Sequence, residues 1–255
     1  MSTQKSLGII VYAPALVGKD RRTVDSVRGM EEALPGLRLE WRLSTSGRPI
    51  ALPRRDTWLI ESIEDGGFPI VCNGDERFPV TVTGRERAGL FSPAGQDQFE
   101  VHAELPLDAA VIEAAPAMLE HVAERAHAFW GQATPDRAAV DIAYQTAPTL
   151  QGPPSPRRGL PALKLFENIR APEIPYYLGW LNYWSADAAK AIGFPDPGRD
   201  AELLSRARRT ASGGWVVRLT DAPLDLDDPD HLEALKRTYE RFPEIGGRTA
   251  PHAKS

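Results

Sequence analysis

The sequence predicts an α+β protein with a mainly antiparallel sheet, packed helices, and two sequence halves that form one globule. Short segments of strand length, apolar or alternating, occur in both halves, and longer amphipathic stretches repeat with the period of a helix. A segment dense in proline separates the halves. With 255 residues, the chain can bury a sizeable core without a disulfide or a metal ion.

The first elements follow from local patterns. Residues 7–12, LGIIVY, form a short apolar run rich in β-branched residues and predict a buried strand. Asp20 or Thr23 can cap the helix that follows, which the Pro35–Gly36 pair should end. Residues 37–43, LRLEWRL, alternate between apolar and charged side chains and predict a half-buried strand.

A hairpin is expected next. The segment FPIVCNGDERFPVTVT contains two strand patterns joined through residues 73–75, a turn composition that tolerates positive φ. Cys72, at the end of the first strand, is interpreted as a small buried hydrophobe, although a catalytic thiol is the alternative. Residues 98–105 alternate again and predict another strand.

Residues 108–130 predict the clearest helix. One stripe of this helix is apolar, with Val111, Ala115, Met118, Leu119, Val122, Ala126 and Phe129. Glu120, Glu124 and His127 lie on the opposite face with a spacing that one metal ion could use. Because charged residues are ordinary on the solvent side of an amphipathic helix, we interpret them as a solvated face.

Seven prolines between residues 145 and 175 exclude an ordinary helix there. We therefore divide the chain into an N-terminal α+β half (1–145), a proline-rich extended segment (146–175), a C-terminal α+β half (176–245) and a disordered tail (246–255).

In the C-terminal half, residues 179–185, GWLNYWS, read as a strand with large side chains on both faces. Ser185 can cap a short helix that Gly193 ends. The rings of this strand are interpreted mainly as core, with an exposed anchor for a partner as the alternative for one of them.

A second amphipathic stretch, DAELLSRARRTA, leads to a strand in SGGWVVRLTDAP. The last helix is capped by Asp228, with Pro229 in its first turn. Between them lies the acidic loop DAPLDLDDPDH, which lacks the glycine and terminal glutamate of an EF-hand. A negative patch facing a basic partner is the functional interpretation of its aspartates 221, 225, 227, 228 and 230.

Composition and motifs exclude several functions. The net charge of −5 argues against direct nucleic-acid binding, and the single cysteine excludes an internal disulfide and a cysteine-based zinc cluster. The first apolar run is too short for a membrane span and lacks a signal-peptide cleavage site, so we expect a cytoplasmic protein. Familiar nucleotide-binding, hydrolase and metalloprotease motifs are missing, and the sequence predicts no catalytic residues, metal or cofactor.

The succession GWLNYWSADAAKAIGF, GGWVVRLTDAPLDLDD and LEALKRTYERF resembles immunity proteins of bacterial polymorphic toxin systems. The immunity protein 52 type and the related type VI secretion immunity families are the most similar classes. The whole chain, from IIVYAPALVG to ERFPEIGGR, is also similar to an uncharacterised bacterial domain family.

The resemblance implies a protein that binds and neutralises a cognate toxin, such as a basic nuclease, by stoichiometric blocking. As partner-binding residues we name Asp221, Asp225 and Asp227, with Tyr183 or Trp184 as an aromatic anchor; these come from composition. We expect a monomer or weak homodimer. Two alternatives stay open, an enzyme of unfamiliar type acting on a small molecule and a self-associating scaffold.

Overall fold

The computed structural model describes residues 5–146 and 156–248, and the statements below concern those residues. The strands are β1 (Ser6–Pro14), β2 (Trp41–Leu43), β3 (Pro49–Ala51), β4 (Gly67–Cys72), β5 (Thr81–Arg87), β6 (Gln98–Pro106), β7 (Trp130–Pro135), β8 (Leu181–Trp184), β9 (Ala207–Arg209) and β10 (Trp215–Arg218). The helices are α1 (Arg22–Ala33), α2 (Arg55–Glu61), α3 (Ala109–Ala126), α4 (Asp136–Ala143), α5 (Ala186–Ala191), α6 (Ala201–Ser205) and α7 (Pro229–Arg241).

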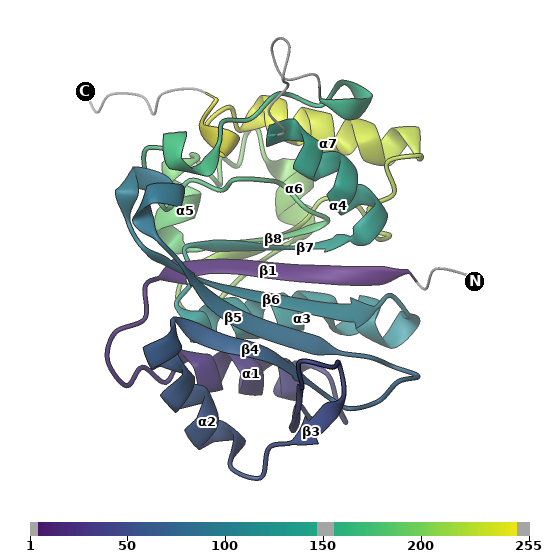
Figure 1. Ribbon diagram of the computed structural model, residues 1–255. Helices are drawn as coiled ribbons and strands as arrows, with labels where there is room; N and C mark the ends of the chain where they lie inside the picture. Colours follow the sequence, from purple (N-terminus) through teal and green to yellow (C-terminus); the bar gives the residue numbers. More distant parts are fainter. Residues whose placement is uncertain (1–4, 147–155, 249–255) are drawn as a thin grey trace.

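All ten strands belong to one antiparallel sheet with the order β3-β2-β4-β5-β6-β1-β7-β8-β10-β9 (Figure 1). The two halves of the sequence meet where β7 pairs with β8, with Trp130 opposite Trp184. This pairing makes a single sheet from both halves, so the predicted α+β class with a mainly antiparallel sheet is confirmed.

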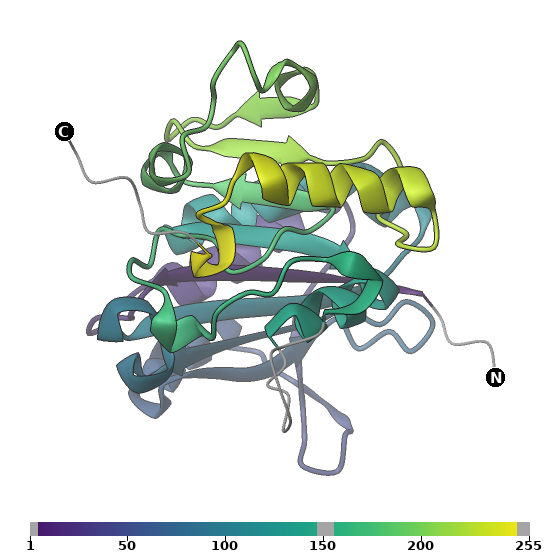
Figure 2. The same cartoon turned by 90° about the horizontal axis from the view of Figure 1, so that it is seen from above.

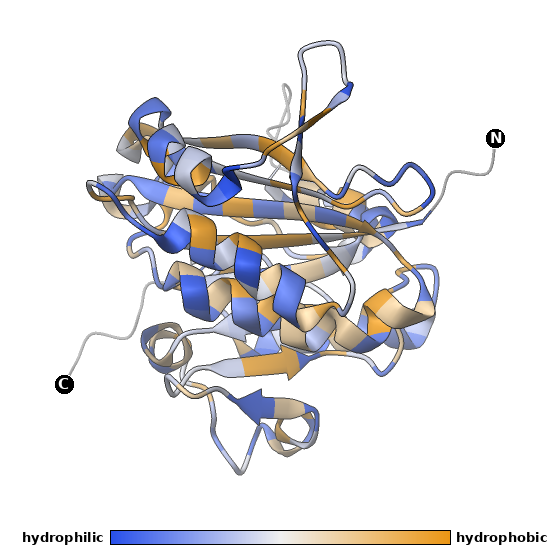
Figure 3. Ribbon diagram, turned by 90° about the horizontal axis from the view of Figure 1, so that it is seen from below, coloured by the Kyte–Doolittle hydropathy of each residue, from blue (hydrophilic) through white to orange (hydrophobic). Residues whose placement is uncertain are grey.

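Helices cover the two faces of the sheet unequally. Helices α1 and α3 lie on one face, against the alternate β1 residues Leu7, Ile9 and Val11, which are buried (Figure 1). Seen from that face, both helices mix hydrophobic and hydrophilic residues along their length, as amphipathic helices do (Figure 3). They approach closely at Gly29, where a Cβ would lie 2.9 Å from the carbonyl oxygen of His121.

On the other face, α4, α7 and the segment after residue 156 cover only part of the sheet. Viewed from above, β4 and β5 extend beyond this cover (Figure 2). Residues on this face of β5 and β6 are correspondingly polar, among them Thr83, Arg85, His102 and Glu104. One face of the sheet is therefore a conventional apolar core, and the other is partly open.

The aromatic residues of β8 are core residues, as the sequence predicts. Tyr183 and Trp184 are 2% and 1% exposed. The ring of Trp184 meets the rings of Phe194 and Phe242 edge-on, with centroids 5.1 and 5.4 Å away. Such edge-to-face pairs add to the burial of large apolar surfaces. Neither residue therefore offers a ring to a partner, which corrects the anchor interpretation.

Two predicted helix caps are confirmed, those of α5 and α7, whereas the N-cap of α1 is Arg21 and not Asp20 or Thr23. The Ser185 hydroxyl accepts from Ala188 N at 3.1 Å, and the Asp228 carboxylate accepts from Asp230 N at 2.9 Å. Gly193 follows α5 with φ +70°, a conformation that glycine adopts without strain.

Three predicted boundaries are wrong. The helix expected over residues 108–130 ends at Ala126, because His127 turns left-handed, and the chain then enters the buried strand β7, which the sequence did not predict. The strand expected over residues 37–43 pairs only from Trp41, since Leu39 N donates to Glu31 at 2.7 Å. The amphipathic stretch DAELLSRARRTA divides into α6 and β9.

Parts of two predicted segments, residues 147–155 and 249–255, lie outside the described residues. Within the proline-rich segment, residues 156–175 contain single 3-10 turns. At the start of the predicted tail, Gly246 is buried and its N–H donates to Pro175 O at 2.8 Å. None of the described helices is long and apolar enough to cross a membrane.

Candidate functional site

A groove of about 780 Å³ lies at one end of the sheet, where β1 begins and α4 starts. We call it the end groove. Its apolar lining consists of Leu107, Ile112, Pro135, Val140, Pro223 and Leu224. Val140 on α4 is 52% exposed, so the groove presents a branched apolar side chain to solvent. The charged residues that line it are Lys5, Asp136, Arg137 and Asp225.

A second hollow, of about 280 Å³, shares Lys5, Ser6 and Asp136 with the end groove. We call it the acidic recess. It extends over the sheet to Thr81 and Glu104. The antiparallel register brings these residues together. Thr81 lies opposite Glu104, and Glu104 lies opposite Gly8, which is two residues from Ser6 on β1. The two hollows thus form one continuous depression.

Two like charges meet in the acidic recess. Burial and the neighbouring charge of Glu104 raise the pKa of Asp136. The hydroxyl of Ser6 donates a hydrogen bond to Asp136. Lys5 is exposed, and the described residues provide no ion-pair partner for its ammonium group. The recess therefore holds two carboxylates close enough to interact unfavourably, a condition that a cation would relieve.

The three aspartates named from the acidic loop have different surroundings. Asp227 pairs with Arg158 at 2.7 Å and with Arg137 at 2.8 Å. Hydrogen bonds and charge from these two guanidinium groups, mainly that of Arg158, lower the pKa of Asp227. Its charge is therefore matched within the chain.

Asp221 is open to solvent and lies 3.5 Å from Arg218. Asp225 lines the end groove, and its carboxylate accepts from Asp227 N at 3.0 Å. Of the three, Asp225 alone lines the end groove.

Two acidic residues on the polar face of α3 have partners within the fold. Glu124 on α3 accepts from the hydroxyls of Tyr183 at 2.8 Å and Ser212 at 2.6 Å, and Glu120 pairs with Arg208. This face of α3 is therefore partly covered by β8, β9 and the turn between β9 and β10, which corrects the interpretation of a solvated face. Within residues 5–146 and 156–248, no group of three acidic, histidine or cysteine side chains could hold a metal ion.

Comparison with known proteins gives a family and a fold. The model of a family described as a domain of unknown function (DUF5953) matches residues 18–250. The chain belongs to this family. No curated protein matches it. Among solved structures, the Pseudomonas aeruginosa T6SS protein PA0821 is similar in fold, with a TM-score of 0.51 and 13% identity over 98% of this chain and 76% of that chain.

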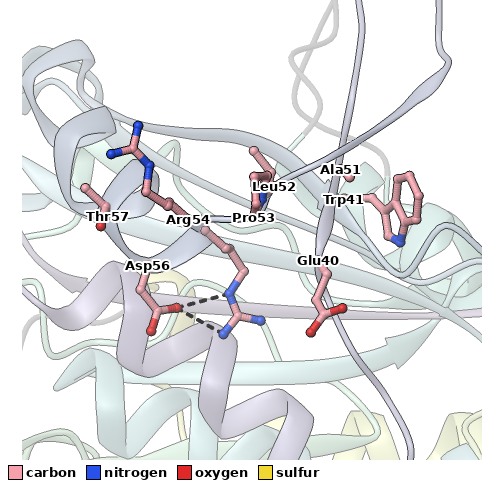
Figure 4. A pocket seen from close by; sticks show the side chains of 9 residues that line it. Glu40, Trp41, Ala51, Leu52, Pro53, Arg54, Asp56 and Thr57 are labelled. Atoms are coloured by element: carbon pink, nitrogen blue, oxygen red, sulfur yellow. Dashed lines mark hydrogen bonds and ion pairs between the residues drawn. The ribbon is translucent and has the colours of Figure 1, made fainter.

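Another hollow of this DUF5953 protein, of about 480 Å³, lies between the β2–β3 hairpin and α2 (Figure 4). Arg55 donates two hydrogen bonds of 3.1 Å to Asp56 inside it. Glu40 and Arg54 also line it, so its two acidic residues are balanced by two basic ones. The end groove also has two acidic and two basic lining residues, but one of its basic residues, Arg137, pairs with Asp227 at 2.8 Å.

The DUF5953 chain also buries an acid, Glu100 in the middle of β6. Burial by itself would raise the pKa of Glu100, but the hydrogen bond from His102 and the charge of Arg87 outweigh it and lower the pKa from 4.5 to about 2. Arg85 adds a bond of 3.0 Å. Glu100 stays ionised and held by three partners, which suits a structural role better than proton transfer.

Sequence reasoning named one residue of the depression, Asp225, and missed Lys5, Glu104, Asp136 and Val140. Glu104 belongs to a predicted strand, where its outward position could be expected from the alternation. Asp136 follows β7, which was not predicted. Since these residues are far apart in sequence, their meeting depends on the strand order.

Proposed function

We propose that this DUF5953 protein is an immunity protein, which binds a cognate bacterial toxin stoichiometrically and blocks it. The observation that carries the proposal is the end groove, an open apolar surface joined to the carboxylates of Asp136 and Glu104, which have no ion-pair partner among the described residues. The resemblance of residues 176–243 to immunity families and the fold shared with a T6SS protein support it.

The chemistry of the depression suits binding to a basic protein. Acidic groups speed the encounter with a basic surface, and a nuclease has such a surface because its groove must hold phosphate. Apolar side chains such as Val140 and Leu224 then provide the area that is removed from water. The described residues that line the depression include no histidine or cysteine, and nothing in this proposal requires turnover.

The proposal is tested by co-expression with the toxin candidate encoded beside this gene. Wild type should restore growth and bind the purified toxin. Val140→Glu should weaken binding at least about tenfold, because it places a charge on the apolar lining. Val17→Glu is the matched control, since Val17 is 78% exposed and follows β1 at the opposite end of that strand.

Both variants should unfold at the temperature of wild type, which shows that the fold is intact. Loss of protection by wild type itself would reject toxin neutralisation. Full protection by Val140→Glu would instead reject the end groove as the binding surface.

A further inference from the structure

We infer that the depression recognises a cationic side chain next to an apolar side chain on the partner, with the cation in the acidic recess and the apolar group in the end groove. This inference rests on the proposed function, because it names the partner chemistry of the same site. The occupant is a segment of a partner protein, because a basic side chain complements the negative charge of the acidic recess.

The acidic recess is the cation subsite. Glu104 comes from the end of β6 and Asp136 from the start of α4, and both line a hollow of about 280 Å³. A guanidinium or ammonium group placed between them would remove the repulsion that the two carboxylates exert on each other. Thr81 and Ser6 add hydroxyl groups to the same lining.

The arginines that the structure describes near the recess do not fill this role. Arg137 follows Asp136 in sequence, but its guanidinium pairs with Asp227 at 2.8 Å. Arg158 holds the other oxygen of Asp227 and also pairs with Asp141, so the nearby arginines form a closed network. This network keeps the acidic loop against α4 and leaves Asp136 and Glu104 outside it.

The apolar subsite begins directly beside the cation subsite. Asp136 is shared by the two hollows, and Val140 lies one helical turn after it on α4. Ile112 on α3 and Leu224 in the acidic loop line the same groove. A partner segment whose cationic group reaches Asp136 therefore places its neighbouring side chain over Val140.

Lys5 gives the inference a distinctive consequence. Its ammonium group is exposed and lines both hollows, so it repels a bound cation while it partly neutralises the carboxylates. Replacing Lys5 with methionine should strengthen binding of a cationic segment. A binding site that only needed apolar contact would not respond in this direction.

The test uses the full chain and three acetylated, amidated peptides: Ala-Arg-Leu-Ala, Ala-Gln-Leu-Ala and Ala-Arg-Gln-Ala. Binding is followed by NMR through the methyl signals of Val140 and Ile112. The first peptide should bind about fivefold more tightly than either of the others, the ratio expected for the loss of one modest contact. Lys5→Met should raise its affinity about twofold, and Asp136→Asn should abolish the preference for arginine over glutamine.

Equal affinity for the three peptides, or no methyl shift at millimolar peptide, would overturn the inference. So would an arginine preference that survives in the Asp136→Asn, Glu104→Gln double variant. If the peptides fail while Val140→Glu still loses toxin binding, this inference is wrong and the proposed function stands. If the peptides bind as expected and no toxin is neutralised, the proposed function is wrong and the preference for a cationic segment stands.

Discussion

Glu100 and Glu104 lie four residues apart on the same face of β6, yet their surroundings are opposite. Glu100 is inaccessible to solvent and is held by Arg85, Arg87 and His102. Glu104 lies at the end of the strand beside a second carboxylate, that of Asp136. Glu100 pairs with two arginines, whereas the described residues of the recess give Glu104 no neighbouring cation except Lys5.

The difference separates charges that stabilise the fold from charges that are available to a partner. Glu100 is deep in the sheet, where an ion can persist only if its hydrogen bonds are satisfied. Glu104 is exposed at the edge of the depression, where water solvates it. We therefore look for binding residues among the unmatched surface charges and not among the buried ones.

The largest expected effect is on stability. Glu100→Gln removes the charge and leaves Arg87 without its partner, so the free energy of unfolding should fall by about 3 kcal/mol. Glu104→Gln, the matched control, should change it by less than about 0.5 kcal/mol. Urea unfolding at pH 7 measures both. Equal effects of the two variants would contradict the distinction between a structural Glu100 and a surface Glu104.

The second prediction concerns acid. Because the pKa of Glu100 is lowered to about 2 in the folded chain, its stabilisation is complete above the unfolded pKa and is lost as pH falls from about 4.5 to 2. The loss in wild type should be on the order of 2–3 kcal/mol. Urea unfolding at several pH values should show this loss in wild type and Glu104→Gln but not in Glu100→Gln.

The third effect is smaller and has the opposite sign. The pKa of Asp136 is raised, so its ionisation opposes folding. This penalty is absent below the unfolded pKa, grows as the pH rises towards the folded pKa, and is complete above it. Glu104→Gln removes the like charge and should lower the pKa of Asp136, which NMR titration of the Asp136 carboxyl measures. An unchanged titration would show that the two carboxylates do not interact.

The smallest effect is kinetic. If the carboxylates of the depression guide a basic partner, Glu104→Gln should reduce the association rate with the toxin a few fold at low salt and much less at high salt. Stopped-flow mixing at two salt concentrations measures this. Glu64→Gln is the control, because Glu64 is exposed on the 3-10 turn after α2, away from the depression. A reduction of the same size in both variants would mean that net charge alone acts.

Local patterns determined much of this fold because they record which side of an element is buried. Period-two alternation indicated β6 and β10, and Ser185 and Asp228 indicated helix starts through the hydrogen bonds that their side chains make. β7 could not be predicted in this way. It is covered on both faces and carries buried Gln132 and Thr134, which bond to each other at 3.3 Å and so remove the usual apolar signature.

The sequence by itself determined the α+β class, the caps of α5 and α7, and the burial of the aromatic residues of β8, because each depends on neighbours a few positions away. Only the tertiary structure decided that Asp227 is neutralised by Arg137 and Arg158 while Glu104 and Asp136 meet unmatched. Those relations are set by strand order and by the packing of α4 and the acidic loop. Charges act through space, so residues distant in sequence settle which of them a partner can use.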